Sequence, residues 1–264
     1  MNNSIIIDDK FIFYRVIGSG NRVVLLHGFA EDGKIWEQQV EFLKSNYQLI
    51  IPDLPGSGQS SLTDKVNIES MADVVYAILE KEHISETVMI GHSMGGYITL
   101  AFARKYPMLL KGFGLFHSTA YPDNEDREAS RKSNIEFIRK NNTHAFLKQS
   151  VPTLFSNDFK TQHPEIVDRF IDRYKTFSSL SLEKYQEAMM RREERTDILK
   201  QFVKPILFII GKHDNAIPFD DSLELCHLPS LSYIHILENS GHMGMIEESG
   251  KTNWILNKFL RDLY

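Results

Sequence analysis

The sequence has a single cysteine, no long apolar run and no excess of positive charge. Cys226 cannot form a disulfide within the chain, so we expect a reducing compartment or no dependence on redox state. The longest apolar stretches, residues 23–26 and 206–210, are far shorter than the ~18 residues that a membrane-spanning helix needs. Lysine and arginine total 30 against 35 aspartate and glutamate residues, so the chain lacks the basic surface that binds nucleic acid.

The N-terminal segment also lacks the features of an export signal. It has no basic start, and only three consecutive apolar residues, 5–7, precede two aspartates. We therefore expect a cytoplasmic protein that acts on a small molecule and meets neither a membrane nor nucleic acid. The 264 residues, of which 42% are hydrophobic and 25% charged, are typical of one large globular domain or of one domain with an insertion.

Short β-branched runs alternate with longer segments of helical period, which predicts an α/β fold with a mostly parallel sheet. Apolar residues at spacings of three and four predict helices over residues 68–79 and 247–264 that cover the sheet. The predicted strands are residues 22–26, 48–52, 87–91, 112–116, 205–211 and 233–237, with an opening hairpin over 5–17.

Residues 121–199 break this alternation. They contain no strand-like run, and their aromatic residues recur at helical spacings. We interpret them as a helical lid inserted into a core of residues 1–120 and 200–264. Within this segment, the charged run over residues 191–195 predicts a solvated helix face, with an arginine turned toward the pocket as the alternative.

A Gly-x-Ser-x-Gly sequence with Ser93 at its centre lies between a predicted strand and a helix-forming stretch. Gly91 and Gly95 let neighbouring backbone pass close to a strained turn that exposes the serine hydroxyl. The hydroxyl also lies at a helix N-terminus, where free N–H groups favour a developing negative charge. The pattern predicts Ser93 as a nucleophile.

A serine nucleophile needs a base to take its proton and an acid to orient that base. Asp214 and His242 each follow a predicted strand, so we expect both at the sheet edge that carries Ser93. Asp220 and Asp221 are alternative acids, although they fall where a helix should begin and are better suited to capping it.

Two backbone N–H groups, of Phe29 and Met94, are candidates for an oxyanion hole. Phe29 follows His27-Gly28 at the end of a strand, and Met94 follows the serine. Removing one such donor typically costs ~3 kcal/mol of transition-state stabilisation. His117 follows another strand, and two interpretations stay open for it: it lines the substrate pocket, or it makes a structural hydrogen bond.

Five segments together resemble the α/β-hydrolase fold family, in particular its capped, single-domain esterases and lactonases. The resemblance covers essentially the whole chain, and the Ser93, Asp214, His242 order is that of the family. The five segments are His27-Gly28-Phe29, residues 52–58, residues 91–96, residues 211–214 and Gly241-His242.

This resemblance implies an eight-stranded sheet with a helical cap after its sixth strand, and neither a metal nor an organic cofactor. It implies Ser93 as nucleophile, His242 as base and Asp214 as acid in the hydrolysis of a small to medium carboxylic ester or lactone through an acyl-enzyme. Two alternatives share the fold: another reaction at the same triad, such as thioester hydrolysis, perhydrolysis or a lyase step, and a non-catalytic ligand receptor.

Overall fold

A computed structural model describes residues 2–264 of the chain and contains one sheet. Its strands are β1 (Asn2–Ile7), β2 (Lys10–Ile17), β3 (Asn21–Leu26), β4 (Tyr47–Pro52), β5 (Thr87–His92), β6 (Leu110–Phe116), β7 (Ile206–Gly211) and β8 (Ser232–Leu237). Their spatial order is β1-β2-β4-β3-β5-β6-β7-β8. β2 pairs antiparallel with β1 and β4, and all other neighbours are parallel. The predicted eight-stranded α/β sheet is confirmed.

Helices cover both faces of this sheet. Successive residues of a strand point to opposite faces, so each central strand contributes side chains to two core clusters. In β3, Val24 and Leu26 join one core cluster, whereas Val23 and Leu25 join the other. The first cluster includes α2 (Ile68–Lys81), α3 (Met94–Lys105), α9 (Thr196–Gln201) and α10 (Phe219–Cys226). The second includes α1 (Glu37–Leu43) and α12 (Ser249–Leu263).

The predicted helix over residues 68–79 is α2, and its sequence accounts for both its start and its buried face. The Asn67 side chain accepts a hydrogen bond from the Ser70 N–H at 2.7 Å, and the Ser70 hydroxyl accepts one from the Asn67 N–H at 3.0 Å. Met71, Val75 and Ile78 are fully buried against the sheet. Burial of each such side chain contributes roughly 1.5–3 kcal/mol to folding.

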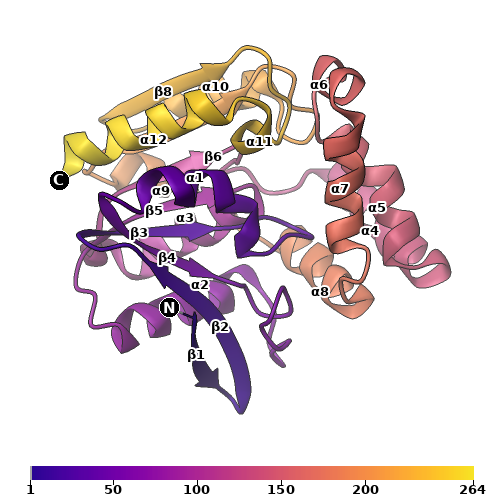
Figure 1. Cartoon of the computed structure of the whole chain (residues 1–264), viewed down its shortest axis with the longest axis horizontal. Helices are drawn as coiled ribbons and strands as arrows, with labels where there is room; N and C mark the ends of the chain where they lie inside the picture. Colours follow the sequence, from indigo (N-terminus) through magenta and orange to yellow (C-terminus); the bar gives the residue numbers. More distant parts are fainter. Residues whose placement is uncertain (1) are drawn as a thin grey trace.

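Between β6 and β7 the chain forms a group of helices and no strand, as the sequence predicts for this region. The group comprises α4 (Glu125–Asn141), α5 (Thr143–Ser150), the 3-10 turn η3 (Val151–Thr153), α6 (Asn157–Gln162), α7 (Pro164–Tyr174) and α8 (Ser179–Met190). Figure 1 shows these helices gathered at one end of the sheet. Phe146, Phe155 and Phe170 pack into the same core cluster as α1 and α12, so the helices are anchored on the sheet.

Two details of the predicted helices are wrong. α12 begins at Ser249 and does not include Glu247, and its Trp254 is exposed rather than packed against the sheet. Asp220 and Asp221 do not cap α10, because they lie within its first turn after the N-cap residue Pro218. Their carboxylates instead lie near the positive end of the helix dipole.

The charged run over residues 191–195 is not a solvated helix face. It connects α8 to α9, and both Arg192 and Arg195 are buried. Arg192 donates to Asp123 at 2.6 Å and lies over the Tyr97 ring at 4.2 Å, while Arg195 pairs with Glu69. Neither arginine lines the pocket beside Ser93. The prediction is wrong because partners distant in the sequence neutralise both cations.

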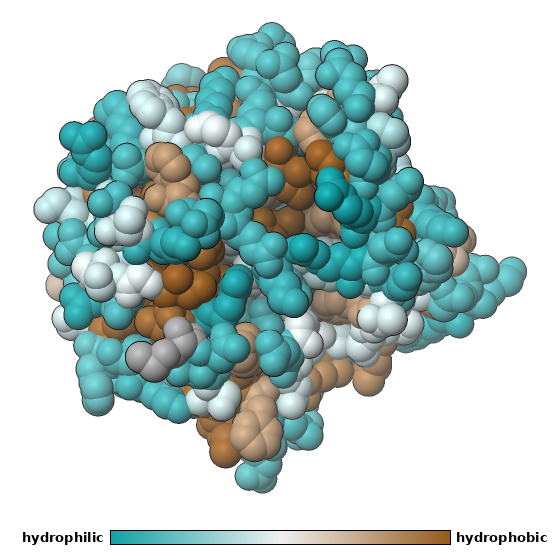
Figure 2. All heavy atoms as spheres, viewed as in Figure 1, coloured by the Kyte–Doolittle hydropathy of each residue, from teal (hydrophilic) through white to brown (hydrophobic). Residues whose placement is uncertain are grey.

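The surface seen in Figure 2 is mainly hydrophilic, and apolar side chains gather in a hollow between the sheet and the helices α4–α8. None of the helices within residues 2–264 is long and apolar enough to cross a bilayer. Cys226, the lone cysteine, is buried in α10 with a free thiol.

Candidate active site

The topology brings the predicted site residues to one edge of the sheet. Ser93 follows β5, Asp214 follows β7 and His242 follows β8. Parallel strands run in the same direction, so their carboxyl ends meet at the same edge. Phe29, after β3, and His117, after β6, reach this edge as well.

Ser93 occupies a sharp turn between β5 and α3, with φ +50° and ψ −117°. A non-glycine residue in such a conformation costs of order 1–3 kcal/mol. The Ser93 N–H donates to the Phe116 carbonyl at 2.9 Å, and the Ser118 hydroxyl donates to the Ser93 carbonyl at 2.8 Å. A Cβ at Gly91 would lie 2.3 Å from the Gly95 carbonyl oxygen, and one at Gly95 would lie 2.6 Å from a β3 carbonyl oxygen. Only glycine fits on either side of this serine.

Asp214 and His242 form a buried hydrogen-bonded pair. His242 Nδ1 lies 2.8 Å from Asp214 Oδ2. The other carboxylate oxygen, Oδ1, accepts from the N–H groups of Ala216 at 2.8 Å and Ile217 at 2.9 Å. Because the carboxylate accepts a hydrogen bond from Nδ1–H, the ring keeps its proton on Nδ1, and Nε2 is the nitrogen left free to accept another proton. The structure pairs His242 with Asp214 rather than with Asp220 or Asp221.

Neighbouring charges set the pKa values of this pair in opposite directions. Burial by itself would raise the pKa of Asp214, but the charge and hydrogen bond of His242, with His117 and the Ile217 N–H, hold it below its ordinary value. Burial by itself would lower the pKa of His242, but Asp214 raises it above 6.5, with smaller contributions from Glu31 and Glu247.

The backbone N–H groups of Phe29 and Met94 are both available for an incoming oxygen. Within residues 2–264 neither donates to an acceptor. The Phe29 loop is held by His27, whose Nε2 accepts from the Leu54 N–H at 3.0 Å and whose Nδ1 lies 2.8 Å from the Gly28 carbonyl. A Cβ at Gly28 would approach the Ser93 Cβ to 3.2 Å, so the loop passes directly beside the serine.

His117 lies under this site and does not line the pocket. Its ring is buried, with Nδ1 3.5 Å from Asp214 Oδ2 and Nε2 3.1 Å from the Gly244 nitrogen, which donates to it. Burial holds the pKa of His117 well below 6.5, so the ring is neutral. Of the two interpretations, the structure shows the structural hydrogen bond, and the prediction of substrate binding is wrong.

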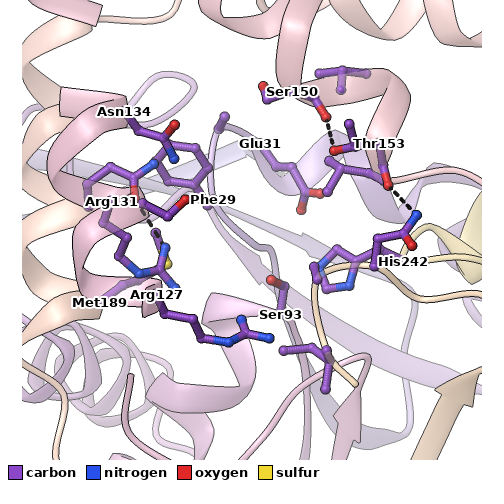
Figure 3. A pocket seen from close by; sticks show the side chains of 18 of the residues that line it. Phe29, Glu31, Ser93, Arg127, Arg131, Asn134, Ser150, Thr153, Met189 and His242 are labelled. Carbon is purple, nitrogen blue, oxygen red and sulfur yellow. Dashed lines mark hydrogen bonds between the residues drawn. The ribbon is translucent and has the colours of Figure 1, made fainter. Parts of the chain in front are cut away.

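Ser93 and His242 open onto a cavity of about 570 Å³ between the sheet edge and the inserted helices. Figure 3 shows both side chains projecting into it, with Phe29 and Glu31 nearby. Within residues 2–264 the Ser93 hydroxyl makes no hydrogen bond to His242. The apolar lining residues include Phe146, Leu147, Val151, Leu154, Phe170 and Met189. A cavity of this size fits a small to medium molecule.

Residues 21–249 match the family of proteins with the alpha/beta hydrolase fold. The chain belongs to this family. A curated relative, the uncharacterized hydrolase YugF of Bacillus subtilis (strain 168), is 27% identical over 250 residues, which cover 90% of this chain and 89% of the relative.

Two solved structures show the same architecture as this hydrolase over its whole length. A thermophilic esterase from Thermogutta terrifontis has a TM-score of 0.93 at 25% identity and covers 100% of this chain and 99% of its own. The enol-lactonase from Burkholderia xenovorans LB400 has a TM-score of 0.90 at 20% identity and covers 98% of this chain and 100% of its own. Because the enol-lactonase is only 20% identical to this chain, its similarity supports the fold alone.

Two glutamates that the sequence analysis did not single out hold the loops of this hydrolase. Glu247 accepts from the N–H groups of Gly241 at 2.9 Å and Met243 at 3.1 Å, on either side of His242. Its other oxygen accepts from the Ser156 N–H at 2.8 Å, which ties the inserted helices to the His242 loop. No motif marks such a residue, since its role depends on three N–H groups that only the fold brings together.

Glu31 is the second of these glutamates, and it links the loop that contains Phe29 to the turn that contains Ser93. It is 2% exposed, and Oε2 accepts from the Gly28 N–H at 2.7 Å and lies 3.1 Å from His92 Nδ1. His92 Nε2 lies 3.0 Å from the His242 carbonyl oxygen. Both ring nitrogens therefore face oxygens, and although burial by itself would raise the pKa of Glu31, His92 and the Gly28 N–H hold it below its ordinary value. His92 also lines part of the pocket.

We predict that Glu31→Gln weakens both folding and turnover. One carboxylate oxygen faces Gly28 N–H and His92 Nδ1 at once. A glutamine amide nitrogen placed there would face the Gly28 N–H as a second donor, and a glutamine oxygen placed there would lack the negative charge that interacts with His92. Leaving a buried polar group unsatisfied costs about 1–3 kcal/mol. Denaturant unfolding and kcat/KM measure the two effects. Glu41→Gln, at an exposed residue paired with Lys44, should change neither, and a Glu31→Gln protein equal to it on both would contradict this role.

Proposed function

We propose that this hydrolase cleaves a small to medium carboxylic ester or lactone through an acyl-enzyme, with Ser93 as nucleophile, His242 as base and Asp214 as orienting acid. The observation that carries the proposal is the 2.8 Å contact of His242 Nδ1 with Asp214, which leaves Nε2 as a base in the cavity that Ser93 also lines. The strained serine turn and the two free N–H groups beside it support the same chemistry.

In the first half of this reaction, the Ser93 hydroxyl oxygen attacks the substrate carbonyl and His242 Nε2 accepts its proton. The tetrahedral oxyanion receives hydrogen bonds from the N–H groups of Phe29 and Met94. The C–O bond to the leaving group then breaks, and His242 returns the proton to the departing oxygen. Hydrogen bonds between nucleophile and base are often long in a free enzyme and shorten with substrate bound.

In the second half, water attacks the acyl-serine. His242 takes a proton from the water, the same two N–H groups bind the new oxyanion, and the proton returns to Ser93 as the acid leaves. Asp214 stays ionised throughout and stabilises the charged imidazole, as its lowered pKa requires.

We further propose that the helices within residues 121–199 act as a cap on this site. α4, α5, η3 and α7 supply much of the cavity lining. The cap contacts the base directly, because the His242 N–H donates to the Leu154 carbonyl at 2.7 Å. Relatives named as a pimeloyl-[acyl-carrier protein] methyl ester esterase and as a thermophilic esterase support an ester as the substrate class.

The pH dependence of kcat/KM tests the base. His242 must be neutral to accept a proton, and its pKa is raised above 6.5. With an ester that does not titrate, kcat/KM should therefore rise with pH through an inflection above pH 6.5 and be below half of its plateau at that pH. An inflection below pH 6.5, or a flat profile, would contradict the assignment.

A substrate panel tests the reaction class. We expect turnover of phenyl esters or aliphatic lactones by the wild-type protein and none by Ser93→Ala. Faster turnover of matched thioesters, or dependence on hydrogen peroxide, would favour another reaction at the same triad.

A further inference from the structure

The cavity beside Ser93 contains a cation that makes no ion pair with any side chain of residues 2–264. Arg127 projects from the first turn of α4, and Figure 3 shows its side chain extending into the cavity toward the Ser93 side. The side chain is half-buried, and within residues 2–264 its guanidinium makes neither a hydrogen bond nor an ion pair. A guanidinium has five N–H donors in a fixed plane, which suit a carboxylate bound through two oxygens.

Other charges in this wall do not neutralise Arg127. Arg131, one helical turn further along α4, pairs with Asp123, and the same buried carboxylate also accepts from Arg192. Burial would raise the pKa of Asp123, but these two arginines hold it below its ordinary value, so it is ionised. Asp126 is exposed at the cavity rim. Arg131 is therefore already paired, and Arg127 is left as a cation of the cavity lining that makes no ion pair within residues 2–264.

The acidic group on the opposite wall is buried and already occupied. Glu31 is 2% exposed, accepts from the Gly28 N–H at 2.7 Å and lies 3.1 Å from His92 Nδ1. The apolar part of the cavity lies elsewhere, on α5, η3 and α7. The cavity therefore joins a reacting serine, an apolar surface and an unpaired cation. Ser130 and Asn134, also on α4, line the same cavity and add uncharged hydrogen-bonding groups to it.

We infer that the substrate carries a carboxylate in addition to the reacting ester or lactone, and that Arg127 binds it. This inference rests on the proposed function and specifies its substrate class. Arg127 is a specificity-determining residue that takes no part in the bond-breaking steps, so its loss should affect charged substrates and spare neutral ones.

Two pairs of esters, each an acid and its neutral methyl ketone analogue, test the inference. The first pair places the carboxylate in the acyl group: phenyl hydrogen glutarate and phenyl 5-oxohexanoate. The second places it in the leaving group: 3-acetoxybenzoate and 3-acetoxyacetophenone. The wild-type protein should prefer the acid of at least one pair by about 10- to 100-fold in kcat/KM, the range expected for a charge-assisted hydrogen bond.

Arg127→Gln should abolish that preference and leave kcat/KM for the ketones within about twofold of wild type, because the guanidinium makes no hydrogen bond or ion pair within residues 2–264 that the substitution would break. Lys140→Gln removes the same charge from the other end of α4, outside the cavity lining, and should keep the preference. The inference would be overturned if the wild-type protein showed no preference for either acid. It would also be overturned if the preference survived in Arg127→Gln, or if Lys140→Gln lost it to the same extent.

Calorimetric titration with glutarate separates failure of this inference from failure of the proposed function. If no ester is cleaved, the proposed function fails and the titration alone decides the anion site. Binding by wild type and Lys140→Gln but not by Arg127→Gln supports the site, and absence of binding by wild type overturns it.

Discussion

Ser93→Ala should lower kcat/KM for any ester substrate by about 10⁴-fold or more, because the variant lacks the hydroxyl that forms the acyl intermediate. Among residues 2–264, the other serine and threonine hydroxyls lining the cavity are those of Ser130, Ser150 and Thr153, on α4, α5 and η3, and the Thr153 hydroxyl donates to the Ser150 carbonyl. Steady-state kinetics with a phenyl ester measures the loss. Activity within tenfold of wild type would contradict Ser93 as the nucleophile.

The matched variant Ser93→Gly separates loss of chemistry from loss of fold. Ser93 has φ +50°, which glycine adopts without strain. We therefore expect Ser93→Gly to be as inactive as Ser93→Ala yet more stable than it, by up to about 1 kcal/mol in denaturant unfolding. An inactive variant that is also unfolded would say nothing of the mechanism, and this pair removes that ambiguity.

Asp214→Asn should lower kcat by about 10³- to 10⁴-fold while the loop stays folded. An asparagine can keep its oxygen on the N–H groups of Ala216 and Ile217, which now bind Oδ1. Its amide then faces His242 Nδ1 as a donor, so the imidazole proton moves to Nε2. In that tautomer Nε2 cannot accept the proton of the serine.

Asp220→Asn and Asp221→Asn are the controls for this variant. Both residues were alternative acids on sequence grounds, and both lie in the first turn of α10, where neither contacts His242. We expect kcat within twofold of wild type for each. Loss of activity in either control, with retention in Asp214→Asn, would reverse the assignment of the acid.

The strands, the serine turn and the order of the site residues could be predicted because each depends on nearby residues. Gly91 and Gly95 must flank Ser93, since a Cβ at either would strike a backbone oxygen within 2.6 Å. Asp214 and His242 follow β-branched runs that also mark their strands. Local pattern together with parallel topology was thus sufficient to bring these side chains to one edge.

The errors concern residues whose partners are far away in the chain. Arg195 pairs with Glu69 and Arg192 with Asp123, so a run that reads as solvated is buried. Glu31 depends on His92 in the same way, 61 residues further along. A local sequence pattern does not identify such pairs. Each charged residue taken alone is predicted to be exposed, because charged side chains are rarely buried unless they are paired.

The most direct test of the central claim is the intact mass of the protein after incubation with an alkyl fluorophosphonate, measured beside Ser93→Ala. A serine activated by its own histidine should be phosphonylated quickly. We predict one adduct on the wild-type protein and none on Ser93→Ala. A wild-type protein that forms no adduct, or an adduct that persists in Ser93→Ala, would contradict Ser93 as the activated nucleophile.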